Sequence, residues 1–286
     1  MSIQVKNLTY VYSEGSPHQS IALDEVSFKA EDGQFIGIIG HTGSGKSTLV
    51  QHLNGLLKPK SGAIVVGETD ITQKDVVMRD IRRKIGLVFQ YPEYQLFEET
   101  VAKDVAFGPL NLGLDKEEID LRVKEAIGLV GLDYDEIKDR SPFDLSGGQK
   151  RRVAIAGVIA MKPEVLILDE PTAGLDPKAH QDILKMVETV HAHEKNIIFL
   201  VSHNMNDIAR LADKILVMEG GKMAMEGTPA QVFARSQELQ EMGLDLPDSA
   251  KLAEAAIKKG LNLPKGLLTI EELEEEVYNL LTEGLK

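Results

Sequence analysis

The 286-residue sequence contains no cysteine and no long hydrophobic run. Without cysteine the chain has no disulfides and no thiolate metal sites, which fits a reducing compartment. The longest apolar stretches, such as residues 153–161, reach about half of the ~20 residues that a membrane-spanning helix requires. The N terminus also has no apolar core of the length that a signal peptide needs. We therefore expect that the chain does not cross a membrane itself and that any membrane role comes through a partner.

Positive charge is scarce as well, because 32 Lys and Arg residues stand against 45 Asp and Glu residues and the formal net charge is −13. Non-specific binding to nucleic acid needs a basic field that releases counterions from phosphates, so the composition argues against it. A nucleotide can still be bound, because a few aligned N–H groups, one lysine and Mg²⁺ act locally. The length allows one large α/β domain and a smaller appendage.

Short apolar runs predict buried strands, and a glycine-rich loop follows the first of them. A helical pattern then covers residues 47–57, and the order of strand, loop and helix is typical of a parallel α/β unit. A second helical pattern covers residues 180–192. The predicted buried strands are 34–40, 84–90, 164–172 and 196–204; the other predicted strands are 3–12 (one strand or two), 21–30 at an edge, 61–71 and a hairpin over 214–227.

Two segments are predicted to be helical. Residues 92–150 lack strong strand runs and contain the charged helical pattern of 116–132, which indicates a helical insertion. After residue 227 the chain is acidic and helical, with capping boxes at Thr228/Gln231 and Thr269/Glu272. This tail either packs on its own domain or forms a dimerisation appendage, and amphipathicity alone does not choose between them.

Residues 40–48, GHTGSGKST, match the phosphate-loop pattern G-x-x-x-x-G-K-[ST]. Gly40, Gly43 and Gly45 allow the backbone to approach phosphate oxygens and to aim N–H groups at them. Lys46 is expected to pair with the β- and γ-phosphates, and the Ser47 hydroxyl to ligate Mg²⁺. The predicted strand before the loop and helix after it argue against a chance match, and the helix adds its positive end.

Two carboxylates, Asp169 and Glu170, end the predicted strand VLILDE at 165–170. The strand would bring Asp169 to the phosphate-loop end of the sheet, where it holds Mg²⁺ directly or through water. Glu170 would orient and deprotonate the attacking water. Many buried strands end in an acid, so this pattern indicates a nucleotide site only because the phosphate loop is also present.

The segment LSGGQ at 145–149 predicts a second anion-binding helix end, because Ser146 and Gln149 resemble a capping box before a helical pattern. The N–H groups that remain free at a helix start attract phosphate. Since the chain already has a phosphate loop, the second end makes sense if it serves the nucleotide held by another subunit. The alternative is an ordinary helix start after a loop.

The order of the phosphate loop, VFQ, LSGGQ, LILDEPT, AGLD and VSHN resembles the nucleotide-binding subunits of ABC transporters over residues 1 to about 225. The resemblance implies a P-loop ABC ATPase core over 1–227, with an antiparallel β subdomain and a helical subdomain at about 92–155. It also implies a small helical C-terminal appendage, 228–286. No essential motif is degenerate, and Ala173, where many relatives carry Ser, is a mild departure.

The same resemblance assigns roles by position. Tyr12 matches the aromatic that stacks on adenine, with Tyr10 as the fallback and a core or edge-strand tyrosine as the alternative. Gln90 matches the residue that senses Mg²⁺ and water, Asp176 the acid that communicates across the dimer, and His203 the switch histidine at the γ-phosphate. The resemblance implies that the catalytic residues are Glu170, His203 and Gln90, and that the metal ligands are Ser47, Gln90 and Asp169. It implies that the nucleotide is bound by Tyr12, Gly40, Thr42, Gly43, Ser44, Gly45, Lys46, Ser47, Thr48, Ser146, Gly147, Gly148, Gln149 and Asp176.

Residues 89–114, FQYPEYQLFEETVAKDVAFGPLNLGL, look like the ATPases of energy-coupling factor (ECF) importers of vitamins and metals. The stretches 40–59 and 141–161 are similar to the second of the two ATPase paralogues of that system. The resemblance implies ATP and Mg²⁺ as ligands and a heterodimer with a related ATPase. It also implies a transmembrane coupling protein and a separate substrate-binding membrane component, with the chain peripheral on the cytoplasmic face of the cell membrane.

The sequence leaves three alternatives to this function. One is a homodimeric ATPase of a cobalt or nickel importer of the same group. Another is a soluble ABC ATPase that acts on nucleic acid or ribosomes, which the single cassette, short insertion and negative charge disfavour. A third is a non-catalytic partner-binding module, which the intact Glu170 argues against.

Overall fold

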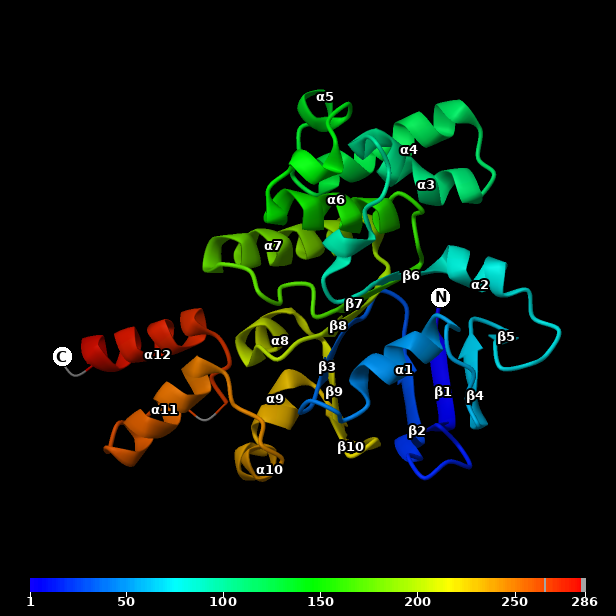
Figure 1. Cartoon of the computed structure of the whole chain (residues 1–286). Helices are drawn as coiled ribbons and strands as arrows, with labels where there is room; N and C mark the ends of the chain where they lie inside the picture. The colour runs from blue at the N-terminus through cyan, green and yellow to red at the C-terminus, as the bar shows by residue number, and fades with distance from the viewer. Residues whose placement is uncertain (265, 284–286) are drawn as a thin grey trace.

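The computed structural model describes residues 1–264 and 266–283, and two β-sheets form its centre (Figure 1). The larger sheet has the strand order β10-β9-β3-β8-β7-β6. All its neighbours are parallel except the β9–β10 hairpin. Its strands are β3 (Phe35–Ile39), β6 (Ile85–Val88), β7 (Val165–Asp169), β8 (Ile197–Val201), β9 (Lys214–Glu219) and β10 (Lys222–Gly227).

The central strands are buried along their whole length, which confirms the strands predicted from apolar runs. Every residue of β3, β7 and β8 is buried. Alternate side chains of β8 enter two different cores: Ile198 and Leu200 face one, and Ile197 and Phe199 face the other. A sheet covered on both faces requires such continuous apolar strands.

The smaller sheet is antiparallel, with the order β2-β1-β4-β5. Residues 3–12 form one strand rather than two, and register shifts interrupt its pairing with the next strand, which lies at the predicted edge. The apolar residues of this sheet share a core with helix α1 and one face of the larger sheet. Its strands are β1 (Ile3–Tyr12), β2 (Ser20–Ala30), β4 (Ser61–Val66) and β5 (Thr69–Asp70).

Helix α1 (Lys46–Leu53) follows β3 and is shorter than the predicted helix over 47–57. It ends at Leu53 because Gly55 takes a left-handed conformation (φ 68°). The Asn54 side chain also donates a hydrogen bond to the carbonyl oxygen of Ile85 at 2.6 Å, which fixes the turn against β6. The helix start, which lies at the phosphate loop, agrees with the prediction to one residue.

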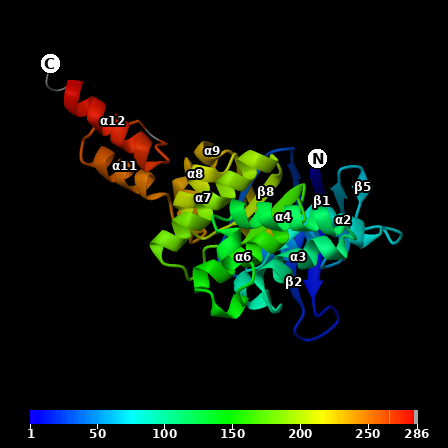
Figure 2. The same ribbon diagram turned by 90° about the horizontal axis from the view of Figure 1, so that it is seen from above.

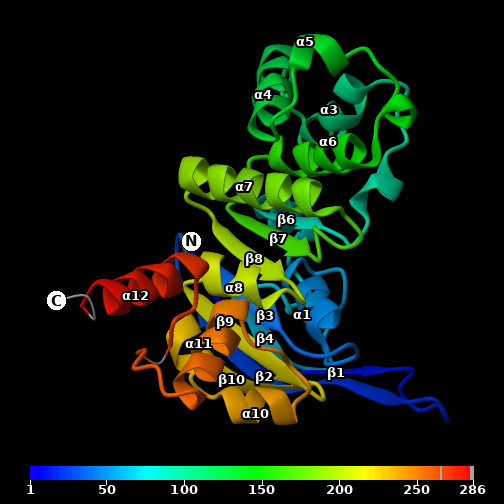
Figure 3. The same cartoon turned by 90° about the vertical axis from the view of Figure 1, so that its left-hand side faces the viewer.

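The segment between β6 and β7 is helical, and its helices gather on one side of the larger sheet with α7 between them and the sheet (Figure 3). The start of α6 is the predicted capping box, which the structure confirms with reciprocal bonds between Ser146 and Gln149. The helices of this segment are η1 (Pro92–Gln95), α3 (Val101–Asn111), α4 (Lys116–Leu129), α5 (Tyr134–Ile137), η2 (Pro142–Asp144) and α6 (Gly147–Ile159). The other helices of the larger sheet are α2 (Met78–Lys84) before β6, α7 (Pro177–Glu194) after β7 and α8 (Met205–Leu211) after β8.

The C-terminal segment divides into two helix pairs. Helices α9 (Pro229–Phe233) and α10 (Ser236–Glu241) contribute Val232, Phe233 and Leu239 to the main core. Helices α11 (Asp248–Lys258) and α12 (Ile270–Glu283) lie side by side and extend away from the rest of the chain (Figure 2). Both predicted capping boxes are confirmed by hydrogen bonds. Across the described residues, no helix combines the length and the apolar character needed to span a bilayer.

Candidate functional site

The loop between β3 and α1 has a backbone that its glycines make possible. Gly45 lies at φ 103°, and a Cβ there would meet the carbonyl oxygen of Ala22 at 2.5 Å. Gly40 lies at φ 153°, and a Cβ there would meet the carbonyl oxygen of Met218 at 2.3 Å. Gly45 precedes α1 without a side-chain cap, so the N–H groups of the first turn have no side-chain acceptor from the cap. The loop therefore provides an anion-binding helix start.

Lys46 extends back over this loop. Its Nζ donates hydrogen bonds to the carbonyl oxygens of Gly40 at 2.7 Å and His41 at 3.0 Å. Burial lowers the pKa of Lys46, and the carboxylates of Glu170 and Asp169 oppose that shift. The lysine thus lies in a buried position beside two acids, at a place where a bound phosphate would favour its charged form.

A cavity of about 410 Å³ lies in front of the loop. Tyr12, whose ring is 41% exposed, lines it and shares a hydrogen bond with the Thr48 hydroxyl at 3.2 Å. Tyr10 is not part of the wall, because it packs edge-on against the buried ring of His52. The cavity is lined by Tyr12, Ser20, Ile21, Ala22, Thr42, Gly43, Gly45, Lys46, Ser47, Thr48, Gln90, Glu170 and His203.

Sequence reasoning missed one part of this wall. Ser20, Ile21 and Ala22 belong to the start of β2, which carries no motif. They reach the cavity because β2 pairs with β1, so that Ser20 lies opposite Tyr12. No local signal in the sequence could have identified them.

Asp169, the last residue of β7, lies behind the cavity and is only 5% exposed. Its Oδ1 has no hydrogen-bond partner among the described residues. Burial raises the pKa of Asp169, and so does the charge of Glu170, whereas the Ser47 hydroxyl and the Lys46 charge lower it. A buried carboxylate oxygen without a partner, next to a hydroxyl, is the donor set that Mg²⁺ prefers, so these residues fit the ion.

Glu170 is held by two side chains from neighbouring segments. Gln90 Nε2 donates to its Oε2 at 3.0 Å, and His203 Nε2 lies 2.8 Å from its Oε1. Glu170 itself has φ 50°, an unfavourable left-handed conformation for a residue with a side chain. The three groups follow the parallel strands β6, β7 and β8, whose carboxyl ends meet at one edge of the sheet.

A second hollow, of about 670 Å³, lies at the start of α6. Ser146, Gly147 and Gly148 line it, and Gln149 closes the capping box behind them. Asp176 also lines it, and its carboxylate caps α7 by accepting hydrogen bonds from the backbone N–H groups of Lys178 and Ala179 at 3.0 Å. Among the residues that the structure describes, none lines both this hollow and the cavity at the phosphate loop.

A third hollow, of about 710 Å³, lies between α2, α3 and α6. The rings of Phe97 and Phe107 meet edge-on at 4.9 Å on its wall and are both exposed. Much of the wall comes from the segment 89–114 singled out in the sequence, including Gln95, Leu96, Asp104, Gly108, Asn111 and Leu112.

The chain has two anion-binding helix starts: α1 follows the phosphate loop, and α6 follows the capping box. This is the arrangement of an ATP-binding cassette (ABC) protein. The structure is similar to two solved cassettes. One is cbiO1 from Clostridium perfringens, part of the ABC transporter complex cbiONQ, with 38% identity, TM-score 0.74 and coverage of 88% of this chain and 98% of the other. The other is dimeric MJ0796 in a post-hydrolysis state with ADP and Pi, with 29% identity, TM-score 0.70 and coverage of 79% and 98%.

Sequence comparison agrees with the structure. The family model for ABC transporters matches residues 23–173. The energy-coupling factor transporter ATP-binding protein EcfA2 of Caldanaerobacter subterraneus is 56% identical over 98% of both chains. EcfA2 of Clostridium tetani is 54% identical over 98% of this chain and 97% of its own. The chain therefore belongs to the ABC transporter family, among the ATP-binding subunits of energy-coupling factor transporters, and is an ATPase of an ECF-type importer.

Proposed function

We propose that this ATPase works by closing on a second ATP-binding subunit around two nucleotides. The observation that carries the proposal is the separation of the two hollows: the phosphate-loop cavity and the α6 hollow share no lining residue. One nucleotide therefore contacts the phosphate loop of one subunit and the α6 start of the other. Closure gains several charge-assisted hydrogen bonds from each triphosphate.

The nucleotide is held by the groups that line the first cavity. The backbone of residues 42–48 and Lys46 Nζ bind the phosphates, and the N-terminal end of α1 adds the positive end of the helix dipole. The exposed ring of Tyr12 is positioned to stack on adenine, supported by its contact with Thr48. In turn, Ser146 and the N–H groups of Gly147 and Gly148 of this chain reach the γ-phosphate of the nucleotide held by the partner's phosphate loop.

Hydrolysis is assigned to the side chains at the carboxyl ends of β6, β7 and β8. Ser47, Gln90 and Asp169 would hold Mg²⁺, which neutralises charge on the phosphate oxygens when bound. Glu170 accepts a proton from water as the water oxygen bonds to the γ-phosphorus and the bond to the β–γ bridging oxygen breaks, giving ADP and phosphate. His203 contacts the γ-phosphate, and Asp176 communicates across the dimer.

The third hollow is the proposed docking site for a transmembrane coupling protein. The exposed aromatic pair Phe97 and Phe107 and the size of the hollow support binding of an apolar helix from such a partner. A solved neighbour, cbiO1, is part of the complex cbiONQ, which supports a membrane assembly. The chain would thus lie on the cytoplasmic face of the membrane and power uptake of a vitamin or another micronutrient bound by a separate membrane component.

We propose a related ATPase as the second subunit, in preference to a homodimer, because this chain matches EcfA2 proteins over nearly its whole length. Co-purification with the products of neighbouring genes decides this point by showing two ATPase species or one. The projecting pair α11 and α12 is the proposed dimerisation element. Tyr278 and Leu281 on α12 are 66% and 64% exposed, so the part of the chain that the structure describes leaves an apolar face of α12 uncovered.

The Gly148→Asp variant tests the two-subunit site. A Cβ at Gly148 would meet only the Ala179 side chain, at 3.9 Å, and an acid in the first turn of a helix is favourable, so we expect the variant to fold. The new negative charge should repel the partner's triphosphate and abolish ATP-dependent pairing, while ATP binding at the phosphate loop persists. Ala230→Asp, which places the same charge in the first turn of α9, is the control. Unchanged ATP-dependent pairing of Gly148→Asp would refute the proposal.

A further inference from the structure

Arg151 is a charged side chain buried inside the helical part of the chain. It lies in α6, two residues after Gln149, and is 2% exposed. In the sequence it belongs to the basic run Lys150-Arg151-Arg152, which by itself indicates an exposed helix face. Burial of a guanidinium is unfavourable unless its N–H groups are paired, so its partners reveal why it is there.

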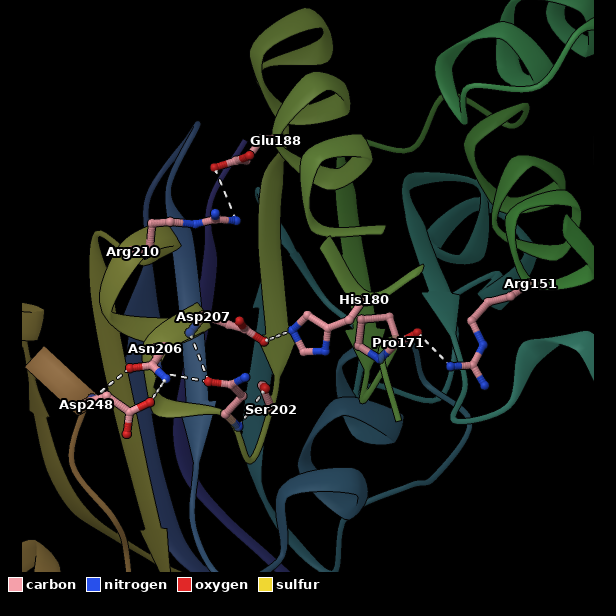
Figure 4. Close-up of polar contacts among 10 residues, drawn as sticks. Arg151, Pro171, His180, Glu188, Ser202, Asn206, Asp207, Arg210 and Asp248 are labelled. Atoms are coloured by element: carbon pink, nitrogen blue, oxygen red, sulfur yellow. Dashed lines mark hydrogen bonds and ion pairs between the residues drawn. The ribbon is translucent and has the colours of Figure 1, made fainter. Parts of the chain in front are cut away.

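Four hydrogen bonds hold the guanidinium. Nε donates to Oε2 of Glu93 at 2.9 Å, and Nη2 donates to Oε1 of the same residue at 2.7 Å. Nη1 donates to the carbonyl oxygens of Pro171 at 3.0 Å and Ala173 at 2.7 Å. Figure 4 shows Arg151 reaching from α6 towards Pro171. The planar fork of arginine fixes these three partners in one geometry, which the single ammonium of lysine would not do.

The partners of Arg151 belong to the two turns that carry the proposed hydrolytic groups. Glu93 lies three residues after Gln90, and Pro171 directly follows Glu170. Both turns contain a left-handed residue with a side chain: Tyr91 has φ 55° and Glu170 has φ 50°. The Tyr91 ring also lies 5.7 Å from the guanidinium carbon. Such conformations persist only where the surrounding contacts hold them, and Arg151 supplies contacts to both turns.

We propose that Arg151 is a positioning residue that links engagement of the partner's nucleotide at the α6 start to the placement of Gln90 and Glu170 in the same chain. The inference rests on the proposed function, because α6 meets the partner's nucleotide only when two subunits close on each other. A shift of the helix start on closure moves the guanidinium, and its hydrogen bonds carry both turns with it. Hydrolysis at one nucleotide thereby depends on occupation of the other.

Arg151→Lys tests the link in the full chain, purified with the subunit with which it pairs. The substitution keeps the charge and loses the fork, so kcat for ATP should fall at least about tenfold through misplacement of Glu170. KM for ATP should change less than about threefold, because Arg151 lies outside the phosphate-loop cavity and, although it lines the α6 hollow, its guanidinium is bonded to Glu93, Pro171 and Ala173. The Hill coefficient for ATP should fall towards one.

A matched control exists in the same helical segment. Arg122 in α4 pairs with Glu118 (Nε–Oε1 2.5 Å) and donates to the carbonyl oxygen of Met161 at 3.3 Å, but contacts neither catalytic turn. Arg122→Lys should leave kcat within about twofold of the unmodified assembly. Glu93→Gln should lower kcat in the same direction as Arg151→Lys, and the double variant should lose less than the two single losses combined. Equal effects of Arg151→Lys and Arg122→Lys on kcat would overturn the proposal.

Measuring ATP-dependent pairing distinguishes a failure of the proposed role of Arg151 from a failure of the two-subunit function on which that role rests. In a Glu170→Gln chain, ATP should produce closed pairs both with Arg151 and with Arg151→Lys, because the N–H groups of the α6 start remain. Failure of the Glu170→Gln chain to pair while Arg151 is intact would refute the two-subunit function. Loss of pairing only when Arg151→Lys is added would show that the arginine merely supports α6, and the proposed link would fail.

Discussion

His203 Nε2 lies 2.8 Å from Oε1 of Glu170, and the two side chains follow the neighbouring parallel strands β8 and β7. The other oxygen of Glu170 accepts a hydrogen bond from Gln90 at 3.0 Å. Both oxygens of the proposed base are thus engaged within the chain. We expect that a bound nucleotide draws His203 and Gln90 towards the γ-phosphate and the metal, which frees Glu170 for water.

Glu170→Gln should reduce ATP turnover by at least about a hundredfold, because the amide cannot accept the proton of the attacking water. ATP binding and ATP-bound closed pairs should remain. Phosphate release and the mass of the ATP-loaded assembly measure the two effects. Glu164→Gln, which changes an exposed acid at the opposite end of β7, is the control. Normal turnover of the Glu170→Gln chain would refute its role as base.

Lys46→Ala should weaken ATP binding roughly 10- to 100-fold, since it removes charge-assisted hydrogen bonds of roughly 1.5–3 kcal/mol in total. Titration with a fluorescent ATP analogue measures the affinity. Lys58→Ala removes an exposed lysine outside the cavity and should change little. If Lys46→Ala bound ATP as tightly as the unmodified chain, the phosphate-loop assignment would be wrong.

Stability towards acid should depend on Glu93. Burial raises the pKa of Glu93, but the hydrogen bonds from Arg151, a backbone hydrogen bond and the charge of Arg151 together outweigh burial and hold this pKa below its ordinary value of 4.5. A lowered folded-state pKa stabilises the fold above the ordinary value, and this contribution is lost as the pH falls through the folded-state pKa. Unfolding midpoints of the unmodified chain and Glu93→Gln should thus differ near pH 7 and converge below pH 4.5. A difference that does not change with pH would contradict this pairing.

The pair of the half-buried His180 and the buried Asp207 should stabilise the contact between α7 and α8. His180 Nε2 lies 2.8 Å from Oδ2 of Asp207 (Figure 4). Burial raises the pKa of Asp207, and the bond to His180 opposes this shift. His180→Ala leaves the carboxylate without this partner and should cost roughly 1–3 kcal/mol of unfolding free energy at pH 7.

The stabilisation by this pair can be isolated with two further variants. In an Asp207→Asn chain, His180→Ala should cost less than in the unmodified chain, because the buried charge is already absent. His193→Ala changes an exposed residue of the same helix and serves as the control. Equal losses from His180→Ala and His193→Ala in denaturant unfolding would show that the pair contributes nothing.

Removal of the C-terminal segment should weaken subunit pairing without changing ATP affinity at the phosphate loop. Truncation after residue 228 also removes Val232 and Phe233 from the core, so truncation after residue 247, which keeps α9 and α10, is the sharper test. Leu281→Glu should weaken pairing in the same way, measured by sedimentation, while Leu121→Glu on α4 should not. Unaltered pairing would indicate that α11 and α12 only pack on their own chain.

Much of the fold was predictable because its signals are local. The apolar runs of β3, β7 and β8 and the capping box of Ser146 and Gln149 depend on residues within a few positions of each other. The prediction that α1 extends to residue 57 was wrong at its end, because the bond from Asn54 to Ile85 joins segments 31 residues apart. The division into domains at about 92–155 and after 227 stays a prediction.

The sequence by itself determined which chemical groups this protein brings to a nucleotide: glycine-lined amides, a lysine, two adjacent acids and a capped helix start. These groups work through backbone geometry that a short motif specifies. Only the tertiary structure decided which distant groups meet them. Arg151 forms hydrogen bonds with residues 58 and 20 positions away in the sequence. The basic run around it could not predict its burial, because a charge is buried or solvated according to the partners that folding brings to it.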